Sequence, residues 1–130
     1  ELKRYVASQE ASGQGESIDT ALAYLCLASV QLDSELWDEA GETMKTVRLR
    51  WTSYIKSKDR YWDMVDGLEF LAVAGADAAA AETTQGKKAV AKRISKWVSA
   101  NDPKFEVNRL ATKIVRRIEK KINSAEVAPN

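Results

Sequence analysis

Residues 107–122 read VNRLATKIVRRIEKKI, and this stretch decides the fold class. Its apolar side chains recur at intervals of three and four residues, which is the period of an α-helix with one apolar face. The apolar positions are Val107, Leu110, Ala111, Ile114, Ile118 and Ile122. The cations around them are Arg109, Lys113, Arg116, Arg117, Lys120 and Lys121. We therefore predict an amphipathic helix with one apolar stripe and a basic remainder.

The same period predicts four earlier helices. The first three are preceded by side chains that accept hydrogen bonds from a first helical turn, and we expect these caps to be Ser17, Ser34 and Asp59. The first helix, ending near Leu32, is apolar over most of its circumference, so we expect it to be the central, most buried one. Its predicted inward stripe is Ile18, Ala21, Leu22, Leu25, Ala28 and Leu32, and the second helix has a seam of Trp37, Ala40, Met44, Val47, Trp51 and Tyr54.

The third helix is predicted to run from Trp62 through the alanines that end at Ala81, and to be terminated by Thr83–Gly86. The fourth presents Val90, Ile94, Trp97 and Val98 inward. Asn101-Asp102-Pro103 then separates it from the fifth, with Pro103 suited to a first helical turn.

These helices predict an all-α fold, a compact antiparallel bundle of four to five helices. The chain has 130 residues and 45% hydrophobic side chains, which is enough for the core of one domain. We expect a flexible or partly helical segment over 1–16, a single bundle domain over 17–124 and a tail over 125–130. The longest apolar stretch, Ala21–Val30, is too short to cross a bilayer, so we predict no transmembrane segment. No targeting signal is recognised, and the localisation stays open.

Residues 21–52 resemble a single tetratricopeptide repeat. That helix-turn-helix motif has aromatic, Leu, small, aromatic, Ala, bulky and small residues at the spacings occupied here by Tyr24, Leu27, Ala28, Trp37, Ala40, Met44 and Val47. The resemblance covers about a quarter of the chain and implies a helical hairpin.

Charge is divided unequally between the two ends of the chain. Residues 1–85 contain 8 Lys or Arg and 15 Asp or Glu, a net charge of −7, whereas residues 86–130 contain 12 and 4, a net charge of +8. The domain thus has an acidic part, residues 17–85, and a basic part, residues 86–124. We expect either an acidic partner for the basic part or a fold that neutralises itself by packing the two parts together.

The composition argues against catalysis. The chain contains no histidine, which removes the commonest general acid–base side chain and the usual zinc and haem ligand sets. Its single cysteine, Cys26, lies between leucines and is expected to be a small buried side chain. Acidic residues cluster near predicted helix starts, where they complement the helix dipole. We predict no enzymatic activity, no metal site and no cofactor.

The basic helices are the predicted interaction site. We expect a helical interaction or scaffold domain that binds an acidic protein surface or a second copy of itself. The predicted partner-binding residues are Lys87, Lys88, Lys92, Arg93, Lys96, Trp97, Arg109, Lys113, Arg116, Arg117, Lys120 and Lys121. Trp97 and the apolar stripe of the fifth helix would be its anchor if that helix is only half covered.

Two alternatives share these helices. Nucleic-acid binding would add the corner at residues 48–62, where cations interleave with aromatic rings and Tyr61 is the ring expected to be free. Its residues are Arg48, Arg50, Lys56, Lys58, Arg60 and Tyr61. The second alternative is peripheral binding to an anionic membrane through the fifth helix.

Overall fold

The computed structural model describes residues 3–4 and 18–127, with side chains up to residue 124. It contains the helices α2 (Ile18–Asp33), α3 (Trp37–Trp51), α4 (Arg60–Ala80), α5 (Thr84–Asn101) and α6 (Phe105–Val127). No strand occurs in the described ranges, and the predicted all-α bundle is confirmed. The predicted cap Ser17 and nearly all of the predicted segment 1–16 lie outside the described residues.

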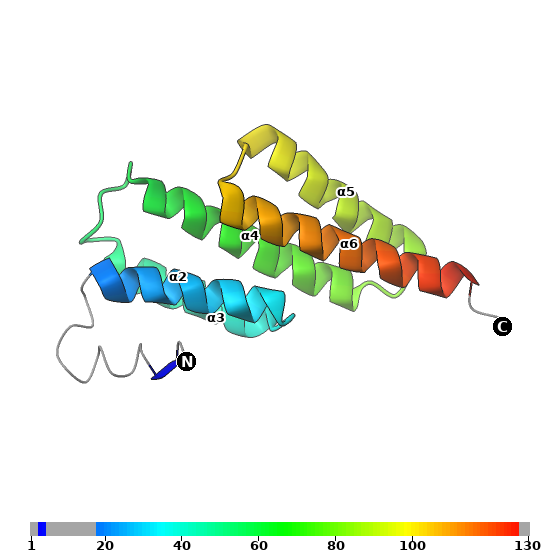
Figure 1. Ribbon diagram of the computed structural model, residues 1–130, viewed down its shortest axis with the longest axis horizontal. Helices are drawn as coiled ribbons and strands as arrows, with labels where there is room; N and C mark the ends of the chain where they lie inside the picture. The colour runs from blue at the N-terminus through cyan, green and yellow to red at the C-terminus, as the bar shows by residue number, and fades with distance from the viewer. Residues whose placement is uncertain (1–2, 5–17, 128–130) are drawn as a thin grey trace.

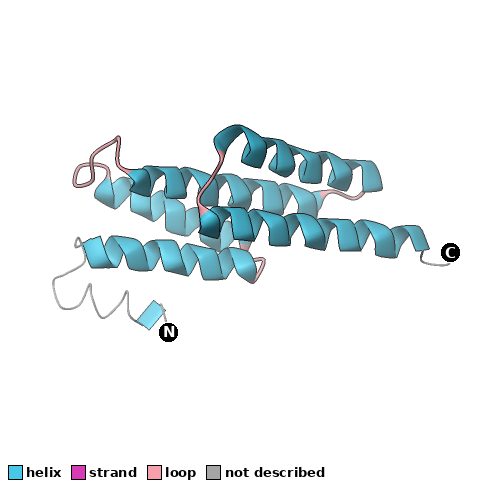
Figure 2. Ribbon diagram, turned by 45° about the horizontal axis from the view of Figure 1, so that its top comes forward, coloured by secondary structure: helices cyan, strands magenta, loops and turns pink. Residues whose placement is uncertain are grey.

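Two helical hairpins pack on a shared central helix. α2 lies beside α3 and α5 lies beside α6 (Figure 1). α4 contacts all four of the other helices, and α2 also meets α6 near the end of α2, as the turned view in Figure 2 shows. The α2–α3 hairpin comes from the acidic part of the sequence and the α5–α6 hairpin from the basic part, so we call them the acidic hairpin and the basic hairpin. Both hairpins pack against α4.

The prediction that the first helix is the central one is wrong. α4 has this role because its buried faces carry small residues that admit a neighbour on several sides, namely Gly67, Ala72, Ala74, Gly75 and Ala78. In α2, by contrast, the predicted inward residues Ile18 and Leu22 are 57% and 49% exposed, while Ala21 and Leu25 are buried. Four of the six predicted inward residues, Ala21, Leu25, Ala28 and Leu32, are thus buried, but a second apolar side of α2 is exposed.

Two glycines of α4 permit close approach of bulky side chains. A Cβ atom built on Gly75 would lie 2.3 Å from the ring of Trp37 in α3. A Cβ on Gly67 would lie 2.8 Å from Val107 in α6. Because such distances are far inside van der Waals contact, both interfaces depend on the missing side chain.

Hydrogen bonds at the helix ends confirm one predicted cap and correct another. The Asp59 carboxylate accepts from the N–H of Tyr61 at 2.8 Å, as predicted. Ser34 does not cap α3: its N–H donates to the carbonyl of Val30, and Glu35 follows with φ 61°, so both residues close α2. Leu36 then precedes α3 without a side-chain cap.

The later boundaries also differ from the predictions. Thr83 does not end α4: its hydroxyl accepts from the N–H of Gly86 at 2.9 Å, so Thr83 caps α5 and Gly86 lies in its first turn. α5 ends at Asn101 and is followed by its C-cap Asp102, which has φ 43°, and Pro103 precedes α6 rather than lying in its first turn. α6 continues to Val127, through the first part of the predicted tail.

The core contains most of the predicted apolar stripes. Ala40, Met44, Val47 and Trp51 of α3 are fully buried, but Tyr54 is exposed because α3 ends at Trp51. The stripe of α6 is at most 5% exposed at Val107, Leu110, Ala111, Ile114, Ile118 and Ile122. This stripe belongs to the core, so it is not an anchor for a partner.

Candidate interaction surface

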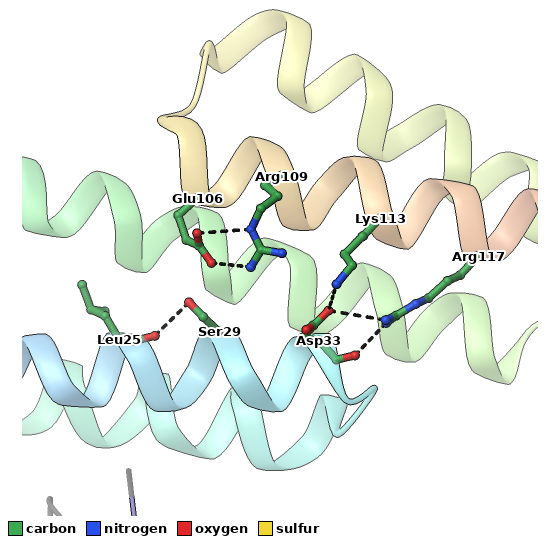
Figure 3. A network of polar contacts seen from close by, with 7 residues as sticks. All are labelled: Leu25, Ser29, Asp33, Glu106, Arg109, Lys113 and Arg117. Carbon is green, nitrogen blue, oxygen red and sulfur yellow. Dashed lines mark hydrogen bonds and ion pairs between the residues drawn. The ribbon is translucent and has the colours of Figure 1, made fainter. Parts of the chain in front are cut away.

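Asp33, at the end of α2, joins the acidic hairpin to the basic one (Figure 3). Lys113 Nζ lies 2.7 Å from Asp33 Oδ1, and Arg117 donates to the Asp33 carbonyl oxygen at 2.8 Å. Lys121, one turn further along α6, lies 3.7 Å from Glu35. These cations are four residues apart, so they share the side of α6 that faces α2.

The pKa of Asp33 is lowered by this contact. Its largest cause is the hydrogen bond from Lys113, and the positive charges of Lys113, Arg117 and Arg109 act in the same direction. Arg109 itself forms a bidentate pair with Glu106 on its own helix, at 2.7 and 3.3 Å. The α2-facing cations of α6 are therefore largely engaged within the molecule.

Two cations of α5 bind α4. Lys87 Nζ donates to the carbonyls of Ala78 and Ala81 at 3.2 and 2.5 Å, which satisfies acceptors at the C-terminal end of α4. Arg93 Nη2 lies 2.6 Å from the carboxylate of Asp77. These contacts and those of Asp33 show that the charge division of the sequence is partly neutralised inside the fold.

Trp97 was predicted to point inward and also to be a candidate anchor for a partner, and it is packed between helices. Its ring stacks on Phe70 of α4, with centroids 4.7 Å apart and an interplanar angle of 11°. The side chain is half-buried against the core. Trp97 therefore stabilises the α4–α5 contact, and its stacked ring is not exposed as an anchor for another protein.

Several cations remain at the outside of the basic hairpin. We define the outer basic face as the exposed side chains Lys92 and Lys96 of α5 together with Arg116 and Lys120 of α6. Lys88 is also exposed, one turn before Lys92, but it is not counted in this face. The members on each helix follow at intervals of four residues, so each set shares one side of its helix. α5 contains no Asp or Glu, whereas on α6 the exposed Glu119 borders the same hollow as Arg116 and Lys120.

The aromatic and basic corner is mostly taken up by packing. Arg48 donates to Glu69 at 2.6 and 2.7 Å and to Asp66 at 2.5 Å, and these carboxylates raise the pKa of its guanidinium. Arg50 lies 4.8 Å from the ring centroid of Trp51. Both predicted phosphate ligands are thus held by neighbouring side chains.

Tyr61 was expected to be the free aromatic ring of this corner, and this is wrong. It is buried, its hydroxyl donates to the carbonyl of Ala21 at 2.9 Å, and burial raises its pKa. Lys56, Lys58 and Arg60 are exposed between α3 and the start of α4. The corner thus presents exposed cations, while Tyr61 cannot stack on a base.

Within the described ranges, no group of three or more His, Cys, Asp or Glu side chains is placed to hold a metal ion. A pocket between α3, α4 and α6, bordered by Trp37, Gly75 and Ile114, has a volume of about 20 Å³, the size of a single water molecule. The carboxylates of Asp66 and Glu69 are bound to Arg48.

Sequence reasoning missed one surface. Cys26 is exposed rather than buried, and it lies on α2 between Leu22 and Val30, which are also about half exposed. Ile18, Leu22, Cys26 and Val30 recur at intervals of four, so the pattern was visible, but it was assigned to the core.

Comparisons of the chain with models of protein families, with curated proteins and with solved structures give no match. The resemblance to a tetratricopeptide repeat therefore stays a prediction. Within the described ranges, no helix has the length and hydropathy needed to span a bilayer.

Proposed function

We propose that this chain is a non-catalytic helical interaction domain that binds an acidic protein surface through the outer basic face. The observation that carries the proposal is the position of this face. Arg93 and Lys113 are bound to Asp77 and Asp33, whereas Lys92, Lys96, Arg116 and Lys120 are exposed. Their charge is available to a partner on the folded protein.

The energetics favour a partner with several carboxylates. A single exposed ion pair contributes about 0–1 kcal/mol, because the charges stay hydrated and long side chains lose freedom. Several cations on two neighbouring helices act together and also steer an acidic partner during encounter. Binding through this face should therefore be weakened strongly by salt.

Protein is favoured over nucleic acid because the predicted stacking corner is occupied. Proteins that bind single strands combine cations with exposed rings. Here Tyr61 is buried and Arg48 is paired with Glu69 and Asp66. The absence of histidine from the chain supports a binding role rather than acid–base catalysis.

Anisotropy of a fluorescent oligoglutamate peptide, measured at rising salt, tests the proposal. We expect the quadruple variant Lys92→Glu, Lys96→Glu, Arg116→Glu and Lys120→Glu to weaken binding at least about tenfold. The control reverses four exposed cations elsewhere, Lys45→Glu, Lys56→Glu, Lys58→Glu and Arg60→Glu, and has the same net charge. It should retain most of the affinity.

If both variants lost the same amount of affinity for the peptide, binding would depend on net charge alone, and the proposal would be overturned. A fluorescent DNA or RNA oligomer of matched charge provides the second arm. If the oligomer binds more tightly than the peptide at the same salt, and the quadruple variant abolishes that binding, a nucleic-acid-binding function replaces the proposed one.

A further inference from the structure

α2 presents an apolar row to the outside of the molecule. Ile18, Leu22 and Val30 are 57%, 49% and 52% exposed, and the exposed Cys26 completes the row. Residues at intervals of four form one ridge on a helix, and packing of such ridges into one another is the commonest geometry of helix pairs. The row is therefore shaped for contact with another helix.

Charge along this face changes sign from one end of α2 to the other. α2 contains no Lys or Arg, and Asp19 lies in its first turn, beside the start of the row. Near the other end, Arg109, Lys113 and Arg117 of α6 point toward α2 (Figure 3). Within the described ranges, the carboxylates paired with these three cations are those of Glu106 and Asp33, so this end has a surplus of positive charge.

We propose that the occupant of this face is a second copy of the chain, bound through an antiparallel α2–α2 contact about a twofold axis. In that arrangement the apolar rows pack against each other, and Asp19 of each copy approaches the cationic end of the other. A twofold axis forms the pairing between Asp19 and the cationic end twice, once at each end of the interface, because the same surface of both copies takes part. The apolar row of α2 contains none of the cations of the outer basic face.

The position of Cys26 gives a direct readout. The middle of the row falls at residue 24, and Cys26 lies about 3 Å from it along the helix axis at 1.5 Å per residue. In the antiparallel pair the two thiols are thus offset by about 6 Å along the axis. A short bismaleimide reagent spans such a gap, so it should link the two copies at Cys26.

Sedimentation equilibrium and this cross-linking test the dimer. We expect the full chain, of 14.4 kDa, to show a concentration-dependent dimer, and Leu22→Glu to raise its Kd at least about tenfold. Leu49→Glu is the matched control, because Leu49 is 80% exposed on α3 and the charge change is the same. Cross-links should be lost in Leu22→Glu and in Cys26→Ser but kept in Leu49→Glu.

Three outcomes would overturn the dimer. The first is a monomer at all concentrations up to about 0.5 mM. The second is an equal effect of the two leucine variants. The third is a monomeric chain that co-sediments with phosphatidylserine vesicles and loses this property in Leu22→Glu, which would make the α2 row a membrane-binding face. We expect the quadruple basic-face variant still to form the dimer. A chain without the dimer would therefore leave the proposed function unaffected, and loss of the proposed function would leave the dimer unaffected.

Discussion

Replacing Gly75 by alanine should destabilise the bundle, although alanine is the better helix former. The new Cβ atom would lie 2.3 Å from the Trp37 ring, whereas ordinary contacts begin at 3.4 Å, so ring and helix must separate by about 1 Å. Such overpacking costs about 1–3 kcal/mol. Exchange of a helical glycine for alanine returns about 0.5–1 kcal/mol. With three ring atoms inside 2.7 Å, we expect a net loss of about 1–2 kcal/mol.

Gly41→Ala separates the packing cost from helix propensity. Gly41 lies inside α3, and a Cβ there meets nothing within 4 Å, so this variant should gain about 0.5–1 kcal/mol. Urea unfolding followed by circular dichroism at 222 nm gives both free energies of unfolding. Because the propensity gain cancels between the variants, their difference of about 1.5–3 kcal/mol reports the Trp37 contact. Stabilities within about 0.5 kcal/mol of each other would refute the close packing of α3 on α4.

Further expectations concern the contacts between helices. Asp33 has a lowered pKa because Lys113 donates to it, so its ionised form stabilises the fold above the unfolded pKa of about 3.9, and this contribution is lost as the pH falls through the folded value. The stability gap between wild type and Asp33→Asn, measured by urea unfolding, should thus be present at pH 7 and shrink below about pH 4; a constant gap would contradict the ion pair. Tyr61→Phe removes the bond to the Ala21 carbonyl and should cost about 1 kcal/mol in the same assay, with no loss if that bond is absent in solution. Lys87→Met removes the cation at the end of α4 and should cost about 0.5–1 kcal/mol, whereas an unchanged stability would argue against this cap.

The candidate site was only partly readable from the sequence. The division of charge correctly identified α5 and α6 as the basic elements, because charge counts need no structure. The sequence did not predict which cations form ion pairs within the bundle. Lys113 pairs with Asp33, 80 residues away, and Arg93 of α5 pairs with Asp77 of α4. Such contacts depend on which sides of two helices meet, and a single sequence does not specify this.

By itself, the sequence determined where helices form and which side of most of them is apolar. The period of three and four and the Asp59 cap are local properties, since they involve residues within about one turn of each other. Tertiary structure decided that α4 rather than α2 is central, that Tyr61 is buried, and that the row from Ile18 to Val30 faces outward. The physical reason is that burial requires a partner surface. The small residues of α4 admit four neighbours, whereas the described bundle leaves one side of α2 without a helix to cover it.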